Sequence, residues 1–146
     1  MARGAGVDQL MGYPDLPPVP VVRVITDDLT TRMSEYIVLH CLQYLGDQRR
    51  CDAQQRAKIW EQDRVAPRAS DVRVGIMGVG VLGQDAARKL SIMGFDVAGW
   101  SRTPREIDGL ETFAGREGLD AFLARTDILV SLLPLTPGTR GLLDRK

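Results

Sequence analysis

The sequence of 146 residues predicts an α/β fold that forms the first half of a doubly wound parallel sheet. Two observations lead to this prediction. From residue 72 to residue 134, short β-rich runs alternate with helix-like segments, and this alternation is typical of parallel strands joined by right-handed crossovers. The stretch VGIMGVGVLG also places glycines between the first of these runs and the helix that follows it,.

The first half of the chain is less regular. VVRVI at 21–25 is short and β-branched, which favours a strand,. Over residues 31–45 apolar side chains recur at helical spacing, and Gly46 is a plausible stop,. Residues 47–70 are charged and predict a connecting segment in which Trp60 is the main apolar anchor.

The second half follows the strand and helix pattern closely. The sequence predicts strands at 72–78, 95–100 and 127–134,. Between them it predicts helices at 81–93 and 119–125, the first of which has one apolar face,.

Composition excludes several classes of function. The 19 Lys and Arg residues balance the 19 Asp and Glu residues, which argues against a nucleic-acid or membrane-surface partner,. No apolar run is long enough to span a membrane. Cys41 and Cys51 match no metal-ligand spacing, so we expect reduced thiols in a cytoplasmic protein and no metal site,.

The glycines at the end of the first β-rich run form the sequence GVGVLG. Gly78 permits a tight turn, Gly80 lets a diphosphate approach the backbone, and Gly83 lets the next helix pack on the strand,. The helix start then offers free N–H groups to the phosphates. Two alternatives remain at this point: a glycine-rich turn in an unrelated α/β domain, and an S-adenosylmethionine-dependent methyltransferase.

The end of the second predicted strand lacks the expected acid. Dinucleotide sites that bind NAD place Asp or Glu there, about 20 residues after the glycines, to bind the ribose hydroxyls. Here the sequence has Ser101, Arg102 and Arg105, which favour the 2′-phosphate of NADP(H) over NAD(H). Alternatively, the arginines are ordinary surface charges that pair with Glu106 and Asp108.

Taken together, these motifs resemble the D-isomer-specific 2-hydroxyacid dehydrogenase family, and within it the glyoxylate/hydroxypyruvate reductase A type. The stretches RGAGVDQL, VVRVITDDLTTRMSEYIVLH, VGIMGVGVLG, GWSRTPR and ILVSLLPLTPGTRGLLD occur in the family's order. The resemblance implies part of a flavodoxin-like substrate domain with an interdomain helix at 1–70, and part of a Rossmann domain at 71–146. It also implies hydride transfer between NADP(H), with NAD(H) as a second option, and a small 2-keto or 2-hydroxy acid. For the full-length family it implies a homodimer.

The resemblance assigns roles to individual residues. Ala5 and Gly6 would bind the substrate carboxylate through their backbone N–H groups. The residues that would contact the cofactor are Gly78, Gly80, Val81, Leu82, Gly83, Ser101, Arg102, Thr103, Arg105, Leu133, Pro134 and Thr139.

We expect none of the family's catalytic residues in this sequence. The resemblance places the catalytic Arg, Glu and His beyond Lys146, and His40 lies in the middle of a predicted helix, where we expect a structural role. We therefore expect an inactive internal fragment. The alternative is a non-catalytic nucleotide-binding or interaction protein. We also expect marginal stability or self-association, because three strands leave an open sheet edge and residues 1–45, with their helix, lack the sheet that they would pack on.

Overall fold

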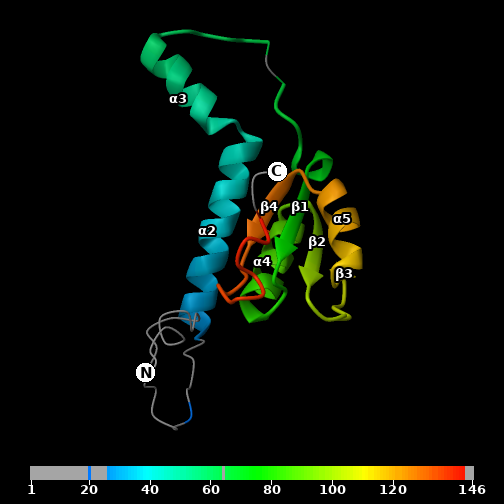
Figure 1. Cartoon of the computed structure of the whole chain (residues 1–146). Helices are drawn as coiled ribbons and strands as arrows, with labels where there is room; N and C mark the ends of the chain where they lie inside the picture. Colours follow the sequence, from blue (N-terminus) through cyan, green and yellow to red (C-terminus); the bar gives the residue numbers. More distant parts are fainter. Residues whose placement is uncertain (1–19, 21–25, 64, 144–146) are drawn as a thin grey trace.

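The computed structural model describes residues 20, 26–63 and 65–143. Its elements are drawn in Figure 1. In chain order they are α2 (Asp27–Leu45), α3 (Gln48–Ala57), the short 3-10 helix η1 (Ala69–Asp71), β1 (Arg73–Met77), α4 (Val81–Ile92), β2 (Asp96–Ser101), β3 (Glu111–Ala114), α5 (Glu117–Ala124) and β4 (Ile128–Ser131).

The four strands form one parallel sheet in the order β3-β2-β1-β4, and the predicted α/β class is confirmed. Met77, the last residue of β1, pairs with Trp100 of β2 and with Ser131 of β4. The carboxyl ends of these three strands therefore meet at one edge of the sheet, which we call the carboxyl edge.

The prediction of three strands was wrong, because the sequence ETFA forms the additional strand β3. This strand is only four residues long, so it carries little periodic signal of its own,. Its pairing with β2, from Ala98 opposite Glu111 to Ser101 opposite Ala114, supplies the backbone partners that make it a strand. The Trp100 indole N–H also donates to the carbonyl of Gly115, 2.9 Å away.

Residues 47–70 are not simply a connecting segment, because they include α3. This helix buries none of its residues and is strongly hydrophilic, so no apolar face indicates it in the sequence. Side chains of Arg50 and Gln54 donate to Glu61 and bind the returning chain to the helix. Trp60 is 86% exposed and anchors nothing within the described chain, contrary to our expectation. We call α3 and residues 58–63 the arm, which stands away from the sheet in Figure 1.

The long helix α2 begins at Asp27, four residues earlier than expected. The Thr26 hydroxyl caps it by accepting a hydrogen bond from the Leu29 N–H at 3.2 Å,. Ile37 and Cys41 are buried in the same apolar cluster as residues of β1 and α4. The expectation that residues 1–45 lack a sheet to pack on was therefore wrong for α2, and the earlier part of that segment lies outside the described residues. The strand expected at 21–25 lies outside the described residues, as does any tail of a substrate domain before Thr26.

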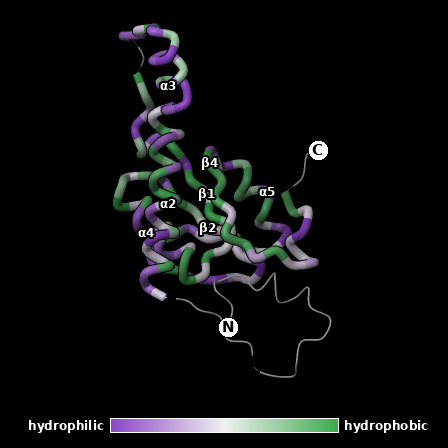
Figure 2. Tube along the Cα trace, turned by 90° about the vertical axis from the view of Figure 1, so that its left-hand side faces the viewer, coloured by the Kyte–Doolittle hydropathy of each residue, from purple (hydrophilic) through white to green (hydrophobic). Residues whose placement is uncertain are grey.

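The core lies on both faces of the sheet. One cluster lies among α2, α4 and the sheet, and a second joins the other face to α5 through Phe122. Figure 2 shows the strands as the most continuous hydrophobic part of the trace, while hydrophilic residues are frequent along α3 and α4. Among the described helices, none has the length and apolar character needed to cross a membrane.

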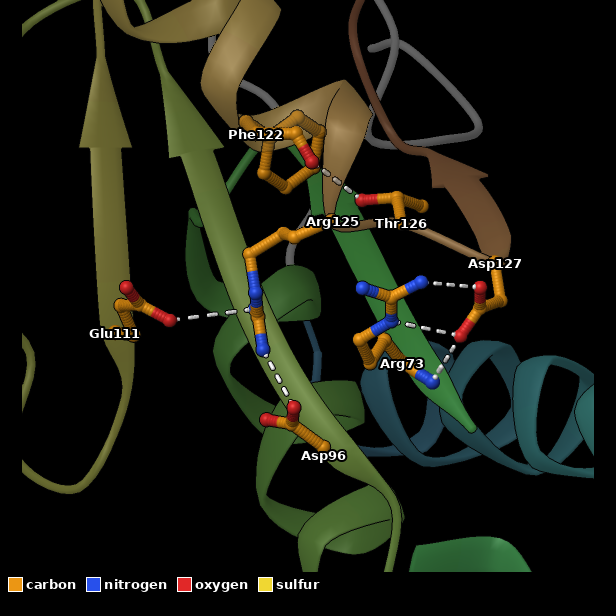
Figure 3. Close-up of polar contacts among 7 residues, drawn as sticks. All are labelled: Arg73, Asp96, Glu111, Phe122, Arg125, Thr126 and Asp127. Atoms are coloured by element: carbon orange, nitrogen blue, oxygen red, sulfur yellow. Dashed lines mark hydrogen bonds and ion pairs between the residues drawn. The ribbon is translucent and has the colours of Figure 1, made fainter. Parts of the chain in front are cut away.

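Ion pairs join the strands at the edge of the sheet opposite the carboxyl edge, where the strands begin (Figure 3). The Arg73 guanidinium contacts the Asp127 carboxylate at 2.8 Å, which links the starts of β1 and β4. Arg125, at the end of α5, contacts Asp96 at 2.7 Å and Glu111 at 3.4 Å. These contacts stabilise the edge away from the glycine turn and leave the carboxyl edge free of them.

Candidate dinucleotide-binding site

The chain leaves β1 through Gly78, whose backbone has a positive φ of 99°. Its N–H donates to the Trp100 carbonyl at 2.8 Å. A Cβ atom at this position would lie 3.2 Å from the backbone carbonyl of Leu132. Both the left-handed conformation and this crowding favour glycine at the turn.

Gly83 lies in the first turn of the helix α4 and packs against the backbone of Gly78. A Cβ atom on Gly83 would overlap the Gly78 carbonyl oxygen and lie 3.1 Å from its carbonyl carbon. The absence of a side chain therefore brings the start of α4 directly onto the end of β1. This close approach places the amino end of the helix at the carboxyl edge.

Gly80 differs from these two glycines, because neither the backbone nor the packing requires it. Its φ of −77° is open to any residue, and a Cβ atom built on it would meet nothing within 4 Å. Gly80 is also the N-cap of α4, and it provides no side-chain cap for the first-turn N–H groups,. The position thus combines unoccupied space with free donors, which fits a diphosphate that approaches the backbone closely.

Val79 holds the turn between these glycines in place. Its side chain is buried, and it lies where a Cβ atom on Gly99 of β2 would stand. The Gln84 amide also donates to the Val79 carbonyl at 3.1 Å. Sequence reasoning missed the supporting roles of Val79 and Gly99. The signal for Gly99 was present, because a glycine inside a strand often marks a close approach.

Ser101 ends β2 beside the glycine turn, and its side chain is already engaged. The buried hydroxyl donates to the backbone carbonyl of Thr103 at 2.7 Å. This contact shapes the turn after β2. In this structure the hydroxyl proton is therefore engaged by the backbone, and the predicted contact of Ser101 with the cofactor stays a prediction.

Arg102 and Arg105 follow on this turn, and both are exposed. Within the described chain neither guanidinium makes an ion pair or a hydrogen bond. The pairing of these arginines with Glu106 and Asp108, which was the alternative interpretation, is therefore not present. Two unpaired positive charges stand next to the end of β2, where an additional phosphate of the cofactor is expected.

The third segment follows β4. The Leu132 N–H donates to the Met77 carbonyl at 2.8 Å, which holds the start of this loop beside β1. Leu133, Pro134 and Thr139 line one pocket of about 180 Å³. The Thr139 hydroxyl donates to the Pro134 carbonyl at 2.5 Å, so the two polar groups fix the loop rather than point outward.

The structure thus brings the glycine turn, the 101–105 turn and the 132–139 loop to one edge of the sheet. Ala5 and Gly6 lie outside the described residues. Among the described His, Cys, Asp and Glu side chains, no group of three could hold a metal ion. His40 makes an edge contact with the Tyr36 ring, with centroids 4.2 Å apart, in the middle of α2.

The fold and the glycine turn define a Rossmann-type dinucleotide-binding unit. A family model described as "D-isomer specific 2-hydroxyacid dehydrogenase, NAD binding domain" matches residues 38–146. The chain therefore belongs to the D-isomer-specific 2-hydroxyacid dehydrogenase family, whose members are NAD(P)-dependent oxidoreductases.

Similar proteins of known sequence and structure agree with this assignment. Glyoxylate/hydroxypyruvate reductase A of Yersinia enterocolitica is 41% identical over 99% of this chain and 48% of its own length. The NADPH-dependent glyoxylate/hydroxypyruvate reductase of Sinorhizobium meliloti, solved with NADP and sulfate, is 56% identical with a TM-score of 0.92, over 97% of this chain and 44% of that one. A family member from Xanthobacter autotrophicus Py2, solved with NADPH and MES, is 42% identical with a TM-score of 0.90, over 94% of this chain and 57% of that one. The chain spans about half the length of the curated relatives it matches.

Proposed function

We propose that this chain provides the cofactor-binding part of an NADP-preferring reductase that interconverts small 2-keto acids and 2-hydroxy acids. The substrates that we propose are glyoxylate and hydroxypyruvate. The names of the similar reductases support this substrate class. The NADP and NADPH in the solved structures of relatives support the cofactor.

The glycine turn binds the diphosphate in this proposal. The backbone N–H groups of Val81 and Leu82, at the start of α4, donate to the phosphate oxygens, and the helix dipole adds to the attraction. Gly80 provides the space for this approach. The bound nicotinamide supplies the hydride, while the chain's own residues bind and orient the cofactor.

The 101–105 turn sets the preference between the two cofactors. Arg102 and Arg105 give charge-assisted hydrogen bonds to the 2′-phosphate, which NADP(H) has and NAD(H) lacks. Ser101 holds the turn through Thr103. NAD(H) binds to the same turn more weakly, because it gains nothing from the two arginines. Leu133, Pro134 and Thr139 line the cofactor on the β4 side.

The observation that carries this proposal is Gly80, at the N-cap of α4, because a Cβ atom built on it would meet nothing within 4 Å and the space beside the first-turn N–H groups is open. The experiment is a fluorescence or calorimetric titration of the chain with NADPH, NADH and S-adenosylmethionine. We expect NADPH to bind most tightly and S-adenosylmethionine not to bind. Tighter binding of S-adenosylmethionine would favour a methyltransferase, and binding of none of the three would reject a nucleotide site.

We also propose that the arm contacts a second copy of the chain; the family resemblance implies a homodimer for the full-length protein, and the assignment of the contact to the arm is our own. The exposed fractions of three apolar residues in and next to the arm support this: 59% for Ile59, 86% for Trp60 and 92% for Val65. A helix of ten residues with no buried face gains little stability from its own packing,. Association would cover these side chains.

A further inference from the structure

We propose that Ser34 and Asp85 are positioning residues that couple the phosphate-binding start of α4 to α2, an inference that rests on the proposed cofactor site. Ser34 lies in α2 and is fully buried. Its hydroxyl is 2.5 Å from Oδ2 of Asp85. Asp85 lies in α4, four residues and therefore about one turn after Val81,.

Asp85 is held as a carboxylate at this place. Partial burial raises the pKa of Asp85, but hydrogen bonds from Lys89, Ser34 and Arg88 outweigh it and lower the pKa to about 2. Lys89 contacts Oδ2 at 2.7 Å, and Arg88 contacts Oδ1 at 2.9 Å. The carboxylate is therefore charged at neutral pH and fixed from its own helix, which makes it a strong acceptor for Ser34.

The remaining contact between the two helices is apolar. Ile37 and Cys41 of α2 share a cluster with Ala86 and Leu90 of α4. Apolar burial has no preferred direction, so it allows small rotations and shifts of one helix on the other. A hydrogen bond requires a particular distance and angle, and it therefore selects one rotation and one register of α2.

Ser34 has a second acceptor that keeps α2 intact without Asp85. Its hydroxyl also lies 2.9 Å from the Thr30 carbonyl, one turn earlier in the same helix. When Asp85 cannot accept, the hydroxyl can donate to Thr30 instead and remain satisfied. Loss of the contact between the helices should therefore uncouple them without leaving an unpaired buried donor.

The coupling matters because of the position of the amino end of α2. In Figure 1 the amino end of α2 lies toward the carboxyl edge of the sheet, where the glycine turn also lies. A diphosphate bound at the start of α4 stabilises the first turns of that helix. Through Asp85 and Ser34, that stabilisation extends to α2.

The experiment measures amide hydrogen exchange of the chain with and without NADPH, in the wild type and in three variants. Ser34→Ala removes the donor, and Asp85→Asn removes the charge but keeps an acceptor. Arg88→Ala is the matched control, because it removes a contact to Oδ1 of Asp85 while Lys89 still holds Oδ2, the atom that accepts from Ser34. Without nucleotide we expect exchange in the middle of α2 to accelerate about tenfold in Ser34→Ala, less in Asp85→Asn and little in Arg88→Ala.

The nucleotide arm separates coupling from a general loss of stability. In the wild type and Arg88→Ala, we expect NADPH to slow exchange in both α4 and α2. In Ser34→Ala, NADPH should slow exchange in α4 only. If NADPH protects α2 equally in Ser34→Ala, the two residues do not couple the helices and the inference is wrong. If NADPH protects no amide in the wild type, the proposed function is wrong, and the coupling of α2 to a bound nucleotide is wrong with it. The exchange rates without nucleotide test the contact separately: faster exchange of α2 in Ser34→Ala than in Arg88→Ala shows that the contact positions α2.

Discussion

Gly83 packs so closely on Gly78 that a single methyl group on Gly83 would overlap the Gly78 carbonyl oxygen. Gly80, between them in the sequence, faces open space. Glycine is therefore present for different physical reasons at these positions, and substitutions at each one can distinguish a packing role from a binding role.

Gly80→Ala and Gly83→Ala should have opposite effects. Gly83→Ala should lower the free energy of unfolding by about 1–3 kcal/mol, because the new methyl group overpacks the turn. Gly80→Ala should leave stability unchanged or raise it slightly, since the unfolded chain loses freedom. It should nevertheless weaken NADPH binding about tenfold, by filling the space that the diphosphate needs. Thermal unfolding and NADPH titration of both variants measure this. Gly80→Ala with unaltered affinity would remove the main support for the cofactor site.

Arg102 should determine the choice of cofactor. Arg102→Gln should weaken NADPH binding about tenfold, because a charge-assisted contact to the 2′-phosphate is lost. NADH affinity should hardly change, and Arg102→Asp should shift the preference toward NADH. Arg56→Gln, on the exposed arm, is the control for a change in overall charge. The affinity ratio of the two nucleotides is the measurement, and an unchanged ratio in Arg102→Asp would reject the phosphate role.

Acid should weaken the link between β1 and β4. The Arg73 guanidinium lowers the pKa of Asp127 to about 2 from an ordinary value of 3.8. A depressed folded-state pKa stabilises the fold above the unfolded value, and the contribution is lost as the pH falls from about 4 toward 2. Both side chains are 40% exposed or more, so Asp127→Asn should cost only about 1 kcal/mol at pH 7,. Denaturant unfolding of both proteins from pH 7 to pH 2.5 should show the difference shrink; a constant difference contradicts this explanation.

Trp60 should contribute to association rather than to folding. Trp60→Ser should reduce dimerisation, because the side chain that it removes is exposed in the single chain. The midpoint of thermal unfolding at dilute concentration should stay nearly the same. Sedimentation velocity across a concentration series measures the first effect. A Trp60→Ser variant that unfolds earlier while it associates normally would place this residue in the folded core instead.

The sequence predicted the parts of the fold that have a strong local pattern. Strands β1, β2 and β4 are apolar runs, and α4 has one apolar face beside a glycine turn, so each could be recognised by itself. Strand β3 could not, since its four residues become a strand only through pairing with β2. Helix α3 also escaped recognition, because it is strongly hydrophilic and buries none of its residues.

The candidate site likewise has parts that a local sequence pattern predicts and parts that depend on the tertiary structure. The glycines and arginines follow neighbouring strands, so their meeting at one edge followed from the predicted parallel sheet. The role of Ser101 depends on a bond to a backbone carbonyl two residues later, which no sequence pattern indicates. The contact of Ser34 with Asp85 joins residues 51 positions apart and needs the packing of α2 on α4, which we had not expected.

The most direct test of the central claim is a two-dimensional NMR titration of isotope-labelled chain with NADPH and with NADH. We predict that both nucleotides shift the backbone amides of Gly80, Val81 and Leu82. Only NADPH should also shift the side-chain Nε–H signals of Arg102 and Arg105. Shifts confined to other parts of the chain, or arginine signals that respond equally to both nucleotides, would contradict the account.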